Sequence, residues 1–244
     1  MDEFDDFDDF IFSDALADEL EIFDKHPEAV GRGALLFHGT PGTGKTSFAK
    51  YLAKKHAHNV RYVDINDDGD EFIKTGWKSG KGQTIGGWAR WFGNTGLSPH
   101  EKDVEEKYFH HALIMDEWND ADRKKQNKWK VAFEQMYDME SIKILIIICM
   151  NTTHAGDTDD TKGKKKLTAA EIKERDKEKL ENKLSPAIKS RCTVIEFSPY
   201  ADEEEEILDK FRKRYPKLTE RQLERTYPDL RSLVRLGERS IKFN

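Results

Sequence analysis

The chain has 244 residues, which is enough for one large α/β domain or for a core domain with a small helical appendage. Hydrophobic and charged residues each make up 36% of it. The hydrophobic ones gather into strand-sized runs, which excludes a wholly disordered chain and leaves no run of the roughly 18 apolar residues that span a membrane. The formal net charge is −6, and the acidic start lacks the basic and apolar regions of a secretory signal, so we expect a cytoplasmic protein (in the host cytoplasm if it is viral) with no membrane partner.

Residues 1–24 hold eleven acidic residues and no lysine or arginine. Residues 25–244 hold all 41 basic residues and the other 36 acidic ones, a formal charge of +5, which permits nucleic-acid binding without demonstrating it. We therefore predict an acidic, flexible leader before a mildly basic body. Phe4, Phe7 and Phe10 lie three apart in the leader. It could be a docking peptide for a basic partner, a shield for the protein's own basic face, or a disordered segment without function.

Five apolar runs, each of strand length, alternate with helical patterns such as 46–55 and 123–137. The predicted strands are Ala34–His38, Val60–Ile65, Ala112–Met115, Ile144–Cys149 and Thr193–Phe197. Most are apolar throughout, as in parallel strands covered on both faces, so we predict an α/β fold with a five-stranded parallel sheet. The two cysteines, Cys149 and Cys192, belong to strand patterns and are expected to be reduced, buried thiols.

After Pro199 the pattern is purely helical, over roughly 202–215, 219–226 and 229–241. The predicted domains are therefore the leader (1–24), an α/β domain (25–199) and a small all-helical domain (200–244). A charged insertion at about 155–183 interrupts the α/β domain. Its part from 162 to 183 has the Glu/Lys pattern of an exposed helix, and binding of DNA or a protein partner is the alternative.

Residues 39–46 read Gly-Thr-Pro-Gly-Thr-Gly-Lys-Thr and match the phosphate-binding pattern G-x-x-x-x-G-K-[ST]. They lie between a predicted strand and a predicted helix, as that loop requires, which disfavours a glycine-rich turn with an incidental lysine. Lys45 would reach the β- and γ-phosphates, and the Thr46 hydroxyl would ligate Mg²⁺. We predict an ATP site with Mg²⁺, held by Gly39, Thr40, Pro41, Gly42, Thr43, Gly44, Lys45, Thr46 and Ser47.

Asp116 and Glu117 follow the third predicted strand. Asp116 would join Thr46 in holding the metal, and Glu117 would polarise a water for in-line attack on the terminal phosphate. Asn151 follows the fourth strand and could orient that water, although asparagine is also a common turn residue. An adjacent Asp-Glu pair suits hydrolysis better than nucleotide binding alone.

Two arginines occur at distinctive positions in the last third of the chain. Arg191 lies in Ser190-Arg-Cys192, directly before the fifth strand, and Arg231 opens the last helix on a face away from Leu230 and Leu233. For each of them, a solvated surface arginine without a role in the site is the alternative.

In this order the motifs resemble those of an AAA+ ATPase, and within that group those of the small ATPase subunits of sliding-clamp loaders (replication factor C and its phage counterparts). Residues 39–46 resemble Walker A and residues 116–117 resemble Walker B, while Asn151 and Arg231 resemble sensor 1 and sensor 2. Ser-Arg-Cys at 190–192 is the most specific match, because in clamp loaders this arginine acts on the ATP of a neighbouring subunit. The resemblance covers about residues 33–66, 112–152 and 184–240.

The resemblance implies a P-loop AAA+ ATPase domain with a helical lid, hydrolysis of ATP to ADP and phosphate, and an oligomer of this chain or of related ATPase subunits. Lys45, Glu117, Asn151 and Arg231 would act in cis and Arg191 in trans. DNA replication would be the process, with primer–template DNA and a sliding clamp as partners. Clamp loaders carry a further helical collar domain beyond the sensor-2 helix, which the few residues after 240 do not supply.

Two other functions remain open: a hexameric helicase or helicase loader of viral type, and an ATP-gated scaffold with little turnover. A nucleic-acid contact is a further candidate at residues 74–91, where three tryptophans alternate with glycines and with the cations Lys78, Lys81 and Arg90. The alternative is that Trp88 and Trp91, three apart, anchor one helix in the core.

Overall fold

A computed structural model describes residues 4–31, 33–66, 77–78, 84–85, 107–138, 142–152, 169–197, 203–227 and 229–242. Its centre is a five-stranded parallel sheet in the order β2-β5-β6-β1-β7, which confirms the predicted fold class. The strands are β1 (Ala34–Gly39), β2 (Ala57–Asp64), β5 (Phe109–Asp116), β6 (Ile144–Asn151) and β7 (Cys192–Glu196). A separate antiparallel ribbon pairs β3 (Trp77–Lys78) with β4 (Thr84–Ile85).

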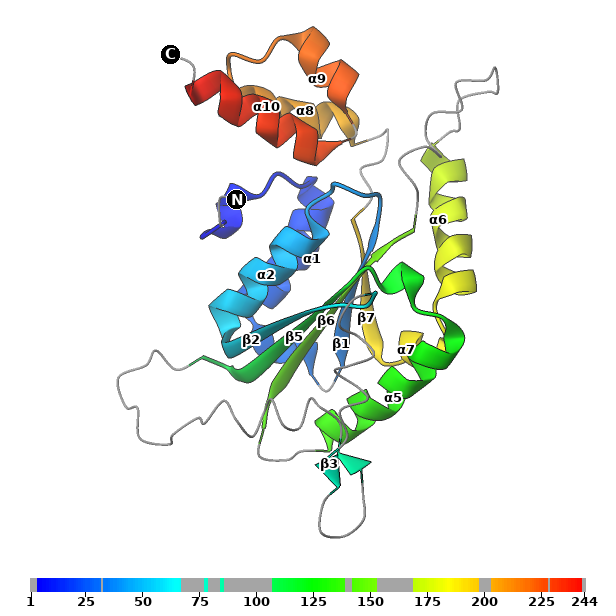
Figure 1. Ribbon diagram of the computed structural model, residues 1–244. Helices are drawn as coiled ribbons and strands as arrows, with labels where there is room; N and C mark the ends of the chain where they lie inside the picture. Colours follow the sequence, from blue (N-terminus) through cyan, green and yellow to red (C-terminus); the bar gives the residue numbers. More distant parts are fainter. Residues whose placement is uncertain are drawn as a thin grey trace.

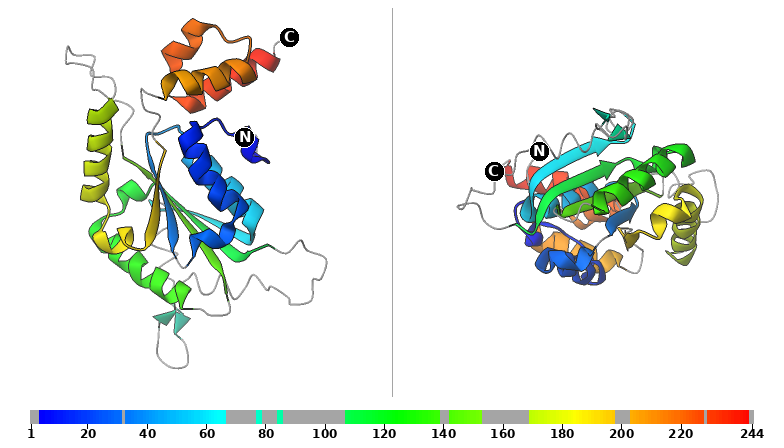
Figure 2. Two further views of the ribbon diagram at one scale, coloured as in Figure 1. Left: turned by 180° about the vertical axis from the view of Figure 1, so that it is seen from behind. Right: turned by 90° about the horizontal axis from the view of Figure 1, so that it is seen from below.

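Helices cover both faces of the sheet (Figures 1 and 2). One face carries α1 (Asp14–Lys25) and α2 (Lys45–His56), and the other carries α5 (Arg123–Tyr137), α6 (Ala169–Lys183) and α7 (Pro186–Lys189). Leu35 and Phe37 of β1 belong to the hydrophobic core beneath α1 and α2, and Leu36 belongs to the core beneath α5, α6 and α7. Both sides of this strand are therefore apolar. Short 3-10 turns occur at Phe7–Asp9, Pro27–Val30 and Trp118–Asp120.

Three further helices lie beyond the carboxyl-terminal edge of the sheet (top of Figure 1). They are α8 (Glu204–Arg214), α9 (Glu220–Thr226) and α10 (Leu230–Lys242), close to the helical segments predicted from the sequence. Phe211, Leu223 and Leu233 are fully buried among them, so these three helices, called the lid below, have their own small core. Within the described residues, no helix has both the length and the apolar character needed to cross a membrane.

Residues 4–25 differ from the predicted flexible leader. They form a 3-10 turn, a short extended stretch and helix α1, and Phe7, Phe10 and Phe12 pack into the core beside Phe48 of α2. Asp5, Asp6 and Asp8 of the same segment are exposed, and Asp5 pairs with Lys54 (2.9 Å). An aromatic residue every two or three positions gives this segment an apolar side that the charge count alone conceals.

The helix of the charged insertion and the burial of the two cysteines differ in detail from the predictions. In the charged insertion, the predicted helix 162–183 is observed from residue 169 as α6, and the part from 153 to 168 lies outside the described residues. Of the two free cysteines, Cys149 is buried in the centre of the sheet. Cys192 is only half-buried, because it begins the edge strand β7.

Candidate functional site

The Walker A loop connects β1 to α2 at the carboxyl-terminal edge of the sheet. Gly42 has φ 85° and Gly44 has φ 95°, a backbone region that other residues rarely adopt. The ammonium group of Lys45 turns back into the loop and donates to the carbonyl oxygens of Gly39 (3.1 Å) and Thr40 (2.6 Å). Lys45 is only 5% exposed, and this burial is the main cause that lowers its pKa to about 8.

Three hydrogen bonds hold the carboxylate of Asp116 at the end of β5. Its Oδ2 atom accepts from the hydroxyl of Thr46 (2.9 Å), at the start of α2, and from that of Tyr62 (2.7 Å), on β2. Its Oδ1 atom accepts from the backbone N–H of Glu117 (3.0 Å). A hydroxyl and a carboxylate at this spacing are hard oxygen donors of the type that Mg²⁺ prefers, so the predicted metal pair fits the ion.

Glu117 adopts a left-handed backbone conformation with φ 54°, unlike every other non-glycine residue that the structure describes. Such a conformation costs about 1 kcal/mol or more and concentrates at functional sites. The side chain of Glu117 accepts a hydrogen bond from Nδ2 of Asn151 (3.2 Å). Burial, and then the charge of Asp116, raise the pKa of the Glu117 carboxyl. The structure thus brings Glu117 and Asn151 together next to Asp116.

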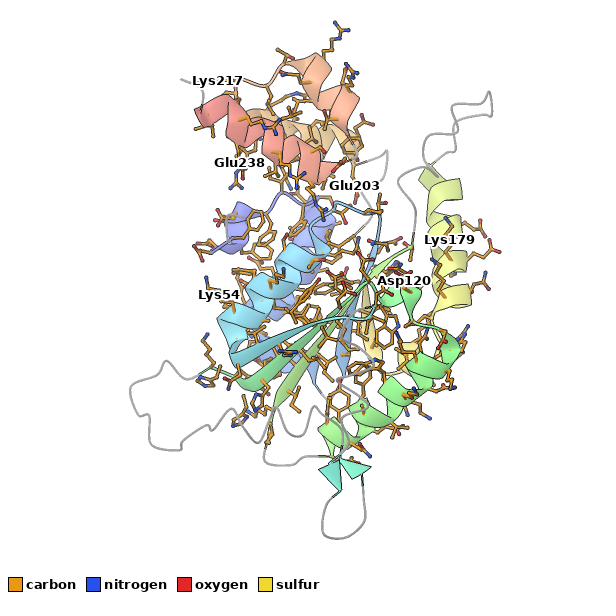
Figure 3. All side chains as sticks on the ribbon, in the orientation of Figure 1. Lys54, Asp120, Lys179, Glu203, Lys217 and Glu238 are labelled. Atoms are coloured by element: carbon orange, nitrogen blue, oxygen red, sulfur yellow. The ribbon has the colours of Figure 1, made fainter. Side chains whose placement is uncertain are left out.

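The lid contacts the Walker A loop directly. The backbone N–H of Arg231 donates to the carbonyl of Gly42 (3.0 Å), while the Arg231 side chain is exposed. A pocket between the lid, the Walker A loop and the segment before α1 is lined by Phe12, Ser13, Leu16, Thr43, Phe197, Glu203, Ile207 and Leu230. Figure 3 shows one of these residues, Glu203, between the lid and the sheet. Sequence reasoning missed this pocket because its walls come from distant segments.

Arg191 lies at the amino-terminal edge of the sheet, opposite the edge that carries the Walker A loop. The carbonyl of Arg191 accepts a hydrogen bond from the N–H of Ala34, which is the first residue of β1. The Walker A loop begins at Gly39, which is the last residue of the same strand. Five residue intervals of about 3.3 Å place these two points about 16 Å apart. The guanidinium of Arg191 binds Glu134 of α5 (2.5 Å) and the carbonyl of Ala187 (2.6 Å). Arg191 therefore does not join the residues around its own subunit's Walker A loop.

The three nucleic-acid candidates are not brought together in the described residues. Lys78 lies in the β3–β4 ribbon, opposite Thr84, whereas Lys81 and Arg90 lie outside the part of the chain that is described.

Comparisons with known proteins agree on the fold. None of the curated proteins compared with the chain matches it. RuvB of Thermotoga maritima, a Holliday junction branch migration motor, is similar over 97% of this chain, with 16% identity and a TM-score of 0.51. The replication initiator DnaA, bound to AMPPCP and single-stranded DNA, is similar over 98%, with 13% identity and a TM-score of 0.56. AMPPCP-bound DnaA from Aquifex aeolicus is similar over 98%, with 14% identity and a TM-score of 0.52.

These identities show a shared fold. The chain spans 64% of the RuvB chain, and 65% and 64% of the two DnaA chains. Residues 35–161, just over half of the sequence, match the profile of the ATPase family associated with various cellular activities (AAA). The chain therefore belongs to the AAA family of ATPases.

Proposed function

We propose that this protein is an ATP-hydrolysing AAA+ motor subunit. It acts in DNA replication as a clamp-loader-like subunit, in an oligomer of itself or of related ATPase subunits. The observation that carries the proposal is the division of the site between two edges of the sheet. Walker A, Asp116, Glu117 and Asn151 meet at the carboxyl-terminal edge, while Arg191 lies at the other edge.

ATP would bind at the Walker A loop. The Lys45 ammonium is held by carbonyl oxygens of its own loop, and a phosphate group entering the loop would take their place as its partner. The amino-terminal end of α2 favours the same negative charge. Thr46 and Asp116 would hold Mg²⁺, which when bound neutralises charge on the phosphates.

Glu117 is placed to act as the general base. Its raised pKa makes the carboxylate a better proton acceptor from an attacking water than an exposed glutamate is. Asn151, bound to the same carboxylate, would orient that water with its amide. Arg231 would act from the lid, because its backbone is already fixed to Gly42 of the Walker A loop.

Arg191 would complete the site of a neighbouring subunit. An arginine about 16 Å along β1 from its own Walker A loop does not reach its own nucleotide, and its side chain is 32% exposed at the amino-terminal edge of the sheet. Arginine suits this role because its planar guanidinium stabilises the charge that develops on the transferring phosphoryl group.

Mixing two inactive variants tests the shared site. Arg191→Ala keeps Glu117 and Glu117→Gln keeps Arg191, so a mixed oligomer contains junctions with both groups intact. We expect partial recovery of ATP turnover in the mixture. Arg221→Ala, a change at an exposed arginine of α9, is the matched control and should be fully active alone. No recovery at any mixing ratio would contradict a site shared between subunits.

The role in replication has separate support and a separate test. The Ser-Arg-Cys motif at 190–192 supports a clamp-loader-like subunit, and two proteins of similar fold are named for work on DNA, as a branch migration motor and as a replication initiator. We expect primer–template DNA to raise ATP turnover, and a sliding clamp to raise it further. Turnover that is indifferent to both would remove replication from the proposal and leave the ATPase.

A further inference from the structure

Tyr62 contributes to the site, although no sequence motif singles it out. It lies on the edge strand β2, which runs parallel to β5 with Tyr62 opposite Ile114 and Asp64 opposite Asp116. Its hydroxyl donates to Oδ2 of Asp116 at 2.7 Å, the shortest of the three hydrogen bonds on that carboxylate.

The hydrogen bonds on Asp116 divide its two oxygen atoms. Each carboxylate oxygen offers two lone-pair directions. On Oδ2, the hydroxyls of Thr46 and Tyr62 occupy both, whereas Oδ1 accepts only the backbone N–H of Glu117 among the described contacts. The carboxylate is thus held in one orientation with one direction of Oδ1 open. Without the Tyr62 hydroxyl, Oδ2 would retain a single donor.

The ring of Tyr62 is held independently of its hydroxyl. The ammonium group of Lys50, on α2, lies 4.7 Å from the ring centroid, at the distance of a cation–π contact. A tyrosine hydroxyl is a neutral phenol at pH 7, so it donates the hydrogen bond that Oδ2 of Asp116 accepts. Replacement by phenylalanine therefore removes the hydroxyl and keeps the ring in place.

We propose that Tyr62 is a positioning residue for magnesium: its hydroxyl fixes the Asp116 carboxylate in the orientation that binds the ion or a metal-bound water. The proposal rests on the proposed function, because it concerns the Mg²⁺ that accompanies ATP. Groups that hydrogen-bond to a metal-binding side chain typically change metal affinity by about 10- to 100-fold when removed. Because Thr46 and Glu117 still hold Asp116, we expect the lower end of that range for Tyr62→Phe.

The test measures binding of a fluorescent, non-hydrolysable ATP analogue in Mg²⁺ and in EDTA. For Tyr62→Phe we expect unchanged affinity in EDTA and a Mg²⁺ concentration for half-maximal binding about tenfold above that of the unmodified protein. Tyr51→Phe is the matched control, because it removes another hydroxyl from a carboxylate, Asp24, away from the metal pair (2.8 Å). Its Mg²⁺ dependence should equal that of the unmodified protein.

The outcomes separate the two proposals. If the unmodified protein binds the analogue more tightly with Mg²⁺ and Tyr62→Phe gives the same titration curve, the positioning role is wrong and the proposed ATP site stands. If Mg²⁺ has no effect on the unmodified protein, the metal pair itself is wrong and the role of Tyr62 fails with it. Equal weakening in Mg²⁺ and in EDTA would also overturn the positioning role, since it would indicate general damage to the fold.

Discussion

The clearest structural prediction concerns Phe12, in the segment expected from its charge to be flexible. Phe12 is only 5% exposed, and its ring contacts those of Phe10, Phe48 and Phe197 with centroids 5.4, 5.7 and 5.7 Å away. Replacing a buried phenylalanine by alanine typically costs about 3–5 kcal/mol. Residues 10–13 belong to no helix or strand, so this stretch can shift to close part of the cavity. We therefore expect Phe12→Ala to lower the free energy of unfolding by about 3 kcal/mol.

Thermal and urea unfolding measure this change. For a domain of this size each kcal/mol lowers the melting temperature by about 2–4 °C, so Phe12→Ala should melt about 6–12 °C below the unmodified protein. Ile22→Ala on α1 is the control, because Ile22 is 51% exposed and its truncation should cost less than about 0.5 kcal/mol. Equal stabilities for the two variants would refute the docking of residues 4–25 on the ATPase core.

Three further changes have distinct expected outcomes. Gly42 has a backbone φ of 85°, and a Cβ atom there would lie 2.8 Å from Oδ1 of Asp229. Gly42→Ala should therefore weaken ATP binding at least about tenfold, as measured by titration. Unchanged binding would contradict the observed contact between the lid and the Walker A loop. The ammonium charge of Lys45 is lost as the pH rises through its pKa of about 8, so the affinity for ATP should fall about tenfold from pH 7 to pH 9. In Lys45→Met the affinity should be weak and independent of pH. The same pH dependence of affinity in both proteins would assign the titration to another group. Gln126 is buried with hydrogen bonds to Ala121, Lys183 and Ser185. Gln126→Leu should therefore lower the free energy of unfolding by about 2 kcal/mol or more in urea, and unchanged stability would contradict this link between α5 and the turn that joins α6 to α7.

The sequence was sufficient to predict the parts of the candidate site that depend on neighbours along the chain. The Walker A loop is one continuous segment between a strand and a helix. Asp116, Glu117 and Asn151 each lie at the carboxyl end of an apolar strand. Since such ends meet at one edge of a parallel sheet, the prediction of a parallel sheet was enough to place them at the same edge.

The remaining parts of the site depend on contacts that strand order does not determine. Tyr62 reaches Asp116 only because β2 and β5 are neighbours in a particular register. Phe12 packs against Phe48 of α2 and lines the pocket together with Ile207 and Leu230 of the lid. The acidic residues near Phe12 had instead led us to expect a flexible segment. The Arg191–Glu134 ion pair likewise joins residues 57 positions apart, which no local pattern relates.

We propose that Arg191 of a neighbouring subunit completes each ATP site. The most direct test is ATP turnover per subunit as a function of protein concentration. We expect turnover per subunit to rise with concentration to a plateau in the unmodified protein and to stay low at every concentration in Arg191→Ala. Turnover per subunit that is independent of concentration and equal in Arg191→Ala would contradict it.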